Sequence, residues 1–153
     1  MPLLITLLQR HLAAPLLLAA TVASAFSGPA AAQAAADDFA RFGSQPGLAA
    51  LMDDFMQRLL DDPRTAPFFK PVNQAHVKAQ LVDQFCALLN GPCRYEGADM
   101  KAAHQDLEIK RADFNALVEA LQQAMDARGV PFAVQNRLLA KLAPMHRDIV
   151  TAR

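Results

Sequence analysis

The sequence is poor in polar aromatic residues and in cysteine: it has no tryptophan, one tyrosine (Tyr95) and two cysteines, Cys86 and Cys93. Nine phenylalanines can fill an apolar pocket, but they offer no polar tip for hydrogen bonding. A cysteine-based metal site needs closer cysteine pairing than this chain offers, and a thiolate nucleophile needs a base partner that is not visible here. The composition therefore argues against a cysteine metal site and against thiol catalysis.

The chain also lacks an excess of charge, period-two alternation and internal repeats. Its 15 basic and 15 acidic residues cancel, so nothing favours binding to nucleic acid or to an anionic membrane surface. Without alternating segments a β-fold is not expected. A length of 153 residues predicts one domain.

The first 34 residues have the pattern of a secretory signal. Arg10 precedes an uncharged apolar run over residues 12–26, and small residues follow, ending in Ala32-Gln33-Ala34. The run is shorter than the roughly 20 residues of a membrane span, so an uncleaved anchor is the weaker alternative. We expect cleavage after Ala34, a mature domain of residues 35–153, and a periplasmic or secreted location.

Apolar residues in the remaining chain recur at helical spacing. One helix is predicted over residues 46–60, with Ser44 as a possible cap, and a second over 73–89, with Asn73 as its cap. A third ends at Gly129, and a fourth begins at Pro131. Pro144 should kink or shorten the fourth helix. The fold class predicted is all-α.

Between the second and third helices lies an irregular segment, residues 91–109, which is too long for an ordinary helix connection. It begins with Gly91-Pro92 and carries Met100 and His104 four residues apart, on one face of a helical turn. Neutral imidazole is a ready metal ligand, and a single proximal histidine commonly holds haem iron. We therefore take His104 as the candidate metal ligand.

Cys86 and Cys93 leave two possibilities. Cys86 lies inside a predicted helix and Cys93 beyond its end, so the Cα separation of about 4.4–6.8 Å that a disulfide needs would require a sharp reversal of the chain. We expect two separate thiols. A disulfide is the alternative, which an oxidising compartment would permit.

Residues 42–150 resemble the group I truncated haemoglobins, which have a two-over-two helical sandwich. The resemblance rests on an ordered set of motifs: Phe42-Gly43-Ser44-Gln45-Pro46-Gly47, Asp54-Phe55, Pro67-Phe68-Phe69, Gly91-Pro92, Tyr95-x-Gly97-x-x-Met100-x-x-x-His104, Gly129-Val130-Pro131 and Ala143-Pro144. Two double glycines of the family are changed here, to Gly43-Ser44 and Asn90-Gly91. The resemblance implies haem b as cofactor, with His104 as proximal ligand and Phe69 packed on the macrocycle.

Haem requires an apolar slot and basic groups at its rim. We expect Met56, Val77, Leu81 and Phe85 on the distal side, and Met100, Phe114, Leu117 and Leu142 on the proximal side. Lys78 and Lys101 are the candidates for contact with the propionates.

The distal side departs from the family, which usually has a tyrosine at the position of Met56 and polar residues at Val77 or Leu81. The resemblance thus implies a pocket without an obvious hydrogen-bond donor. Such a donor contributes roughly 1.5–3 kcal/mol to a charged partner. We therefore expect bound oxygen to be released quickly, and carbon monoxide and nitric oxide to be less affected.

The family resemblance predicts an oxygen-binding or carrier-type protein that binds diatomic gases at pentacoordinate ferrous iron. A haem redox enzyme (nitric oxide dioxygenation or peroxide turnover), with an unidentified redox partner, is one alternative. His/Met ligation through Met56, as in electron-transfer proteins, is another, and a sixth ligand from His76 is a third. The helical angle of His76 points away from the expected pocket, and His146 is expected to be solvated. A cofactor-free helical interaction domain is the rival from a different class.

Overall fold

The computed structural model describes residues 38–152, so the expected signal segment 1–34 lies outside the described residues. Residues 38–152 contain helices and no strand, which confirms the all-α prediction. The helices are α2 (Ser44–Asp61), α3 (Ala66–Phe69), α4 (Gln74–Leu88), α5 (Met100–His104), α6 (Arg111–Ala127), α7 (Phe132–Leu142), the 3-10 turn η1 (Ala143–Met145) and α8 (His146–Ile149). None of these described helices is both long and apolar enough to cross a membrane.

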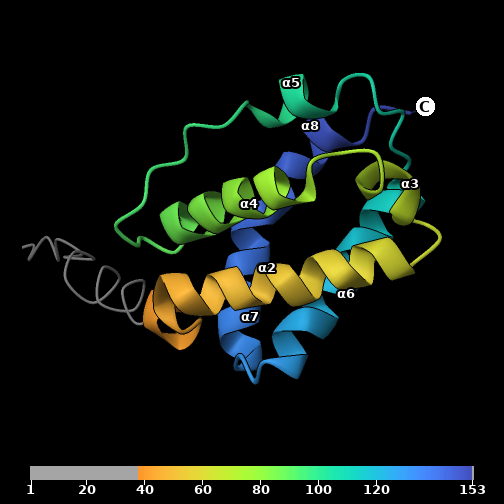
Figure 1. The fold of residues 1–153 in the computed structure, drawn as a ribbon. Helices are drawn as coiled ribbons and strands as arrows, with labels where there is room; N and C mark the ends of the chain where they lie inside the picture. The colour runs from red at the N-terminus through yellow and green to blue at the C-terminus, as the bar shows by residue number, and fades with distance from the viewer. Residues whose placement is uncertain (1–37, 153) are drawn as a thin grey trace, which may run out of the picture.

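The long helices pack as two layers. α2 and α4 run side by side across the front of Figure 1, and α6 and α7 lie behind them. α2 contacts both α4 and α6, and α4 contacts α7, so α2 and α4 each touch the rear layer. The short helix α5 lies over α4 and packs against α8.

The core lies between these layers and is built from the apolar faces that the sequence periodicity predicts. Its central members are Leu48, Leu51, Met52, Phe55 and Leu59 of α2, Phe85 and Cys86 of α4, Leu121 and Met125 of α6, and Leu138 of α7. Each is at most 2% exposed. Burial of one such large apolar side chain contributes roughly 1.5–3 kcal/mol, so α2 is the best-anchored helix of the fold.

Two of the expected helix ends are confirmed, and the start of α2 is different. Asn73 caps α4, because its side-chain oxygen accepts a hydrogen bond from the backbone N–H of His76 at 3.1 Å. α7 stops at Leu142 before the Pro144 turn, as expected. The Ser44 cap is wrong: the cap of α2 is Gly43 at φ 78°, no side-chain cap bond forms, and Ser44 itself has φ 57°.

Cys86 and Cys93 form a disulfide with a Cα–Cα distance of 5.7 Å, so the expectation of two separate thiols is wrong. The physical reason lies in the turn that ends α4. Asn90 adopts a left-handed conformation (φ 56°), the Gly91 N–H donates to the Cys86 carbonyl at 2.8 Å, and the Asn90 N–H donates to the Ala87 carbonyl at 3.1 Å. This pair of bonds is a Schellman turn, which reverses the chain within two residues and brings Cys93 back to α4.

Candidate functional site

A cavity of about 790 Å³ lies between α4, α5 and α6, and we call it the main cavity. Its size falls within the roughly 300–1,000 Å³ of sites that bind small molecules and cofactors. Most of its wall is apolar: Phe55, Phe68, Phe69, Val72, Val77, Leu81, Phe85, Met100, Leu107, Ile109, Phe114, Leu117, Val118, Leu121, Leu139, Leu142, Met145 and Ile149. A large flat apolar ligand suits such a wall, because burial of apolar surface on both partners is favourable.

α4 presents two parallel rows of side chains to the main cavity. The row expected from the sequence is apolar and consists of Val77, Leu81 and Phe85. The neighbouring row is polar and consists of His76, Gln80 and Gln84, which also line the cavity and were not predicted to do so. Both rows have the i, i+4 spacing of one helix face, and this spacing is the sequence signal that could have identified the polar row.

The three polar side chains of this row have different surroundings. His76 lies on the first turn of α4 and is exposed to solvent. Because it also lines the cavity, the expectation that it points away from the pocket is wrong. Gln80 packs against the loop, where its amide oxygen lies 2.2 Å from the position a Cβ would take on Gly97. Gln84 is 7% exposed, and its amide nitrogen lies 3.7 Å from the Met100 sulfur and 3.8 Å from that of Met145.

His104 lines the main cavity at the end of α5. The carboxylate of Asp99 caps this helix by accepting a hydrogen bond from the Ala102 N–H at 2.7 Å. The Nδ1 atom of His104 lies 2.6 Å from the carbonyl oxygen of Met100. Because a carbonyl can only accept, Nδ1 carries the proton, and in the neutral ring Nε2 keeps the lone pair that can bind a metal.

The other predicted site residues divide into two groups. Phe69, Met100, Phe114, Leu117 and Leu142 line the main cavity together with His104 and the apolar row of α4. Met56, Lys78 and Lys101 are not among the lining residues.

Two of these three exceptions, Met56 and Lys78, have a physical reason. α2 turns Phe55 to the cavity, and Met56, about 100° further round the helix, does not line it. Met56 is nevertheless buried, at 3% exposure. The Lys78 ammonium donates to the Asp53 carboxylate at 2.6 Å, and Lys101 is exposed on α5.

Tyr95, the one tyrosine, stands beside the cavity and orders the loop before α5. Its hydroxyl donates to the Ala98 carbonyl at 2.8 Å. Burial, together with the nearby negative charge of Asp99, raises the pKa of Tyr95, so the phenol keeps its proton. The phenol therefore acts as a donor to the backbone in this loop.

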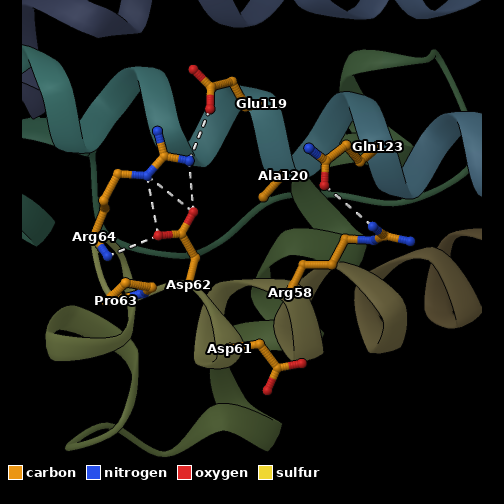
Figure 2. Close-up of a pocket in the computed structure, with 8 residues that line it drawn as sticks. All are labelled: Arg58, Asp61, Asp62, Pro63, Arg64, Glu119, Ala120 and Gln123. Atoms are coloured by element: carbon orange, nitrogen blue, oxygen red, sulfur yellow. Dashed lines mark hydrogen bonds and ion pairs between the residues drawn. The ribbon is translucent and has the colours of Figure 1, made fainter.

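A second cavity, of about 540 Å³, lies where the end of α2 meets α6, and Figure 2 shows its charged lining. The Arg64 guanidinium contacts the carboxylates of Asp62 at 2.7 Å and Glu119 at 2.9 Å. The Arg58 side chain donates to Gln123 at 3.3 Å and to Asp54 at 3.0 Å. Since these charges are already paired with one another, the cluster braces α2 and the segment after it against α6 and is a poor candidate for a ligand site.

The donor set of the main cavity fits haem. No group of three or more His, Cys, Asp or Glu side chains in residues 38–152 could hold a metal ion by itself. A single imidazole with a fixed Nδ1 proton, at the edge of an apolar cavity, matches instead a metal whose other ligands come from a macrocycle.

The two-layer helical fold with one histidine at an apolar slot defines the class of small globins. The chain belongs to the bacterial-like globin family, whose family model matches residues 38–151, and within it to the group 1 truncated haemoglobins. This family membership implies haem-based gas binding, and it confirms the resemblance found in the sequence.

Individual relatives cover most of the described chain. Group 1 truncated haemoglobin GlbN of Mycolicibacterium paratuberculosis is 33% identical over 111 residues, which are 72% of this chain and 82% of that protein. The group 1 truncated haemoglobin of Tetrahymena pyriformis is 28% identical over 112 residues, which are 73% of this chain and 93% of that protein.

Two solved structures show the same fold. The crystal structure of the Tetrahymena pyriformis truncated haemoglobin in its Fe(III) form aligns with a TM-score of 0.70 at 27% identity, covering 74% of this chain and 97% of that one. The 2/2 haemoglobin of Synechococcus sp., solved with covalently attached haem, has the same TM-score at 22% identity, covering the same shares of the two chains. The second likeness concerns the fold alone.

Proposed function

We propose that this protein binds haem b in the main cavity, with His104 as the proximal ligand, and reversibly binds diatomic gases (oxygen, nitric oxide and carbon monoxide). The observation that carries the proposal is the 2.6 Å contact between His104 Nδ1 and the Met100 carbonyl, in a ring that lines an apolar cavity. When bound, haem would supply the iron that binds a gas molecule, and His104 would hold that iron.

The residues of the chain have three tasks in this proposal. The Met100 carbonyl holds the proton on Nδ1 and so fixes the orientation of the ring and the basicity of Nε2. Phe69 and Phe114 provide flat apolar surface, and Val77 and Leu81 keep water from the gas side. A dry site of this kind favours reversible binding of a neutral gas.

We infer that oxygen is held weakly. The apolar row of α4 offers no hydrogen-bond donor. In the neighbouring polar row, His76 is exposed to solvent, the Gln80 amide oxygen packs beside Gly97, and the Gln84 amide nitrogen contacts two sulfurs. Bound oxygen carries partial negative charge and loses roughly 1.5–3 kcal/mol when no donor is present. Carbon monoxide carries less charge and loses less.

His76 replaces the two lysines as the proposed contact for the haem carboxylates. It lines the cavity, is exposed to water and has a ring N–H that can donate to a carboxylate, whereas Lys78 is paired with Asp53. His76→Ala should therefore keep the haem absorption spectrum but speed haem transfer to an acceptor globin roughly threefold to tenfold, as for the loss of one hydrogen bond. An unchanged transfer rate would remove His76 from the site.

The decisive experiment is an absorption spectrum of purified protein before and after addition of haem. The wild-type protein should show a Soret band and bind carbon monoxide in the ferrous state. His104→Ala should lose haem or lose the iron–histidine stretching band in resonance Raman, and exogenous imidazole should restore that band. His146 is half-buried rather than solvated, and its ring packs edge-on against Phe114 with the ring centroids 4.8 Å apart. His146→Phe is therefore the matched control: it removes the imidazole, keeps a ring beside Phe114 and should behave as wild type.

We also propose that residues 1–34 direct export and are removed. The pattern of a basic residue, an apolar run and Ala32-Gln33-Ala34 supports this, and so does the Cys86–Cys93 disulfide, because disulfides persist in oxidising compartments.

A further inference from the structure

α5, which carries His104, does not hold itself in place. It has five residues and none of them is buried. Helices much shorter than about 12 residues are unstable in water unless tertiary contacts support them. The position of the proximal imidazole therefore depends on α8, which packs on α5, and on the segments on either side of α5.

On the side that precedes α5, the loop is fastened in the ways already described. The disulfide ties Cys93 to α4, the Tyr95 hydroxyl bonds the Ala98 carbonyl, and Asp99 caps the helix. This side has a covalent anchor.

On the side that follows α5, residues 105–108 are exposed, and the chain is next fastened at Ile109. Ile109 is 7% exposed and lines the main cavity. Its backbone N–H donates to the Thr151 hydroxyl at 3.1 Å, and its carbonyl accepts from the N–H groups of Thr151 and Ala152, both at 3.0 Å. We call Thr151 and Ala152, which make this contact, the strap.

A backbone outlier marks the same point. Glu108, directly before Ile109, has φ 50°, a left-handed conformation that residues other than glycine rarely adopt. Such conformations persist where surrounding contacts hold them, and the three bonds to Ile109 are the contacts next to Glu108. The strap follows α8, the helix that packs on α5.

We propose that Thr151 is a positioning residue for His104: its hydroxyl and backbone fasten Ile109 and thereby fix the end of the segment that carries the proximal imidazole. This inference rests on the proposed role of His104. Loss of the hydroxyl leaves the buried Ile109 N–H without its acceptor and loosens α5, although Thr151 itself does not line the cavity.

The test uses Thr151→Val, which keeps the shape but removes the hydroxyl, and Thr151→Ser, which keeps the hydroxyl. In haem-free protein, hydrogen exchange at the amides of residues 102–109 should rise roughly tenfold in Thr151→Val and return towards the wild-type rate in Thr151→Ser. The amides of α6 should not change. In the haem-loaded ferrous protein, the iron–histidine stretching band should shift or broaden, and haem transfer to an acceptor globin should be faster, in Thr151→Val alone.

Several results would overturn the proposal: unchanged exchange at residues 102–109, equal effects of Val and Ser, exchange raised equally in α6, or loosened exchange with an unaltered iron–histidine band. If Thr151→Val does not fold, Ala152→Pro removes one donor to the Ile109 carbonyl and must give the same local pattern. The exchange arm needs no haem. A failure of the proposed haem ligation would instead appear as an unaltered iron–histidine band in His104→Ala.

Discussion

At the scale of single residues, the orientation of the His104 ring depends on a hydrogen bond within its own helix. The carbonyl that fixes the His104 ring belongs to Met100, four residues earlier on the same helix. The tautomer is therefore set locally, while the position of the helix is set by distant residues. These two tasks can be separated by mutation, because a change in the strap moves the ring without removing its hydrogen bond.

A polar side chain in the apolar row of α4 should slow oxygen release. Leu81→Gln places an amide donor on the cavity face, so the oxygen dissociation rate should fall roughly tenfold to a hundredfold, while carbon monoxide release changes much less. Stopped-flow displacement of oxygen by carbon monoxide measures the rate. Leu81→Met is the matched control and should keep the fast release; an unchanged rate in Leu81→Gln would mean that this row does not face the gas.

Much of the candidate site could be predicted at this scale, because apolar residues at i, i+4 spacing must share a helix face. Val77, Leu81 and Phe85 follow from that rule, and all three line the main cavity. Whether Phe55 or Met56 lines the cavity could not be predicted, since it depends on how far α2 is rotated about its own axis against its neighbours. His76 was misplaced because the rotation of α4 was equally unknown.

At the scale of elements, the helices were predictable and some of their ends were not. Asparagine and proline each have a well-defined role at a helix end, so Asn73 and Pro144 marked helix boundaries correctly. The left-handed turn at Asn90 was not foreseen, and the error about the cysteines follows from it. A sharp reversal at a helix C-terminus depends on backbone hydrogen bonds that composition does not reveal.

Removal of the disulfide should lower stability at the junction of α4 and the loop. Closing a loop between residues seven positions apart contributes about 2.5 kcal/mol by restricting the unfolded chain. Chemical denaturation of the oxidised and reduced wild-type protein should show this difference. The Cys86→Ala/Cys93→Ala double variant should unfold like the reduced protein and should not respond to reductant; a response would trace the effect to something other than the disulfide.

The ion pair that joins residue 38 to α7 should make stability depend on pH. The Arg137 guanidinium donates to the nearly buried Asp38 carboxylate at 2.6 and 2.7 Å, and this hydrogen bonding lowers the pKa of Asp38 below its ordinary value of 3.8. A lowered carboxyl pKa stabilises the fold above the ordinary value, and the stabilisation disappears as the pH falls through the lowered value.

Asp38→Asn should therefore reduce the free energy of unfolding at pH 7 by about 1 kcal/mol, with a smaller difference below pH 3.8. Urea titrations across this pH range measure both quantities. Asp106→Asn, at an exposed position with no ion pair in the described residues, is the control and should show neither effect. A penalty that stays constant down to the lowest pH would show that the Asp38 carboxylate is not its source.

At the scale of the whole molecule, the order of the Gly- and Pro-containing motifs that end helices predicted the fold better than any single motif did. Gly91-Pro92, Gly129-Val130-Pro131 and Ala143-Pro144 divide the chain into pieces whose lengths allow two layers of helices and one long loop. The loop passes over α4 and leads to α5 (Figure 1), and His104 of α5 lines the main cavity. The contact between residues 109 and 151 could not be predicted in this way, because it joins positions 42 apart through one side-chain hydroxyl and backbone groups.

Export is a property of the complete chain, and it has a sharp test. When the full sequence is expressed in a Gram-negative host, the periplasmic product should begin at Ala35, and its mass should show the Cys86–Cys93 bond. Ala34→Phe should block processing, because signal cleavage requires a small residue just before the cut, whereas Gln33→Leu, at the tolerant position between the two alanines, should be processed normally. A product that retains Met1 and stays in the cytoplasm would contradict export. The disulfide would then need another explanation, since the cytoplasm keeps most thiols reduced.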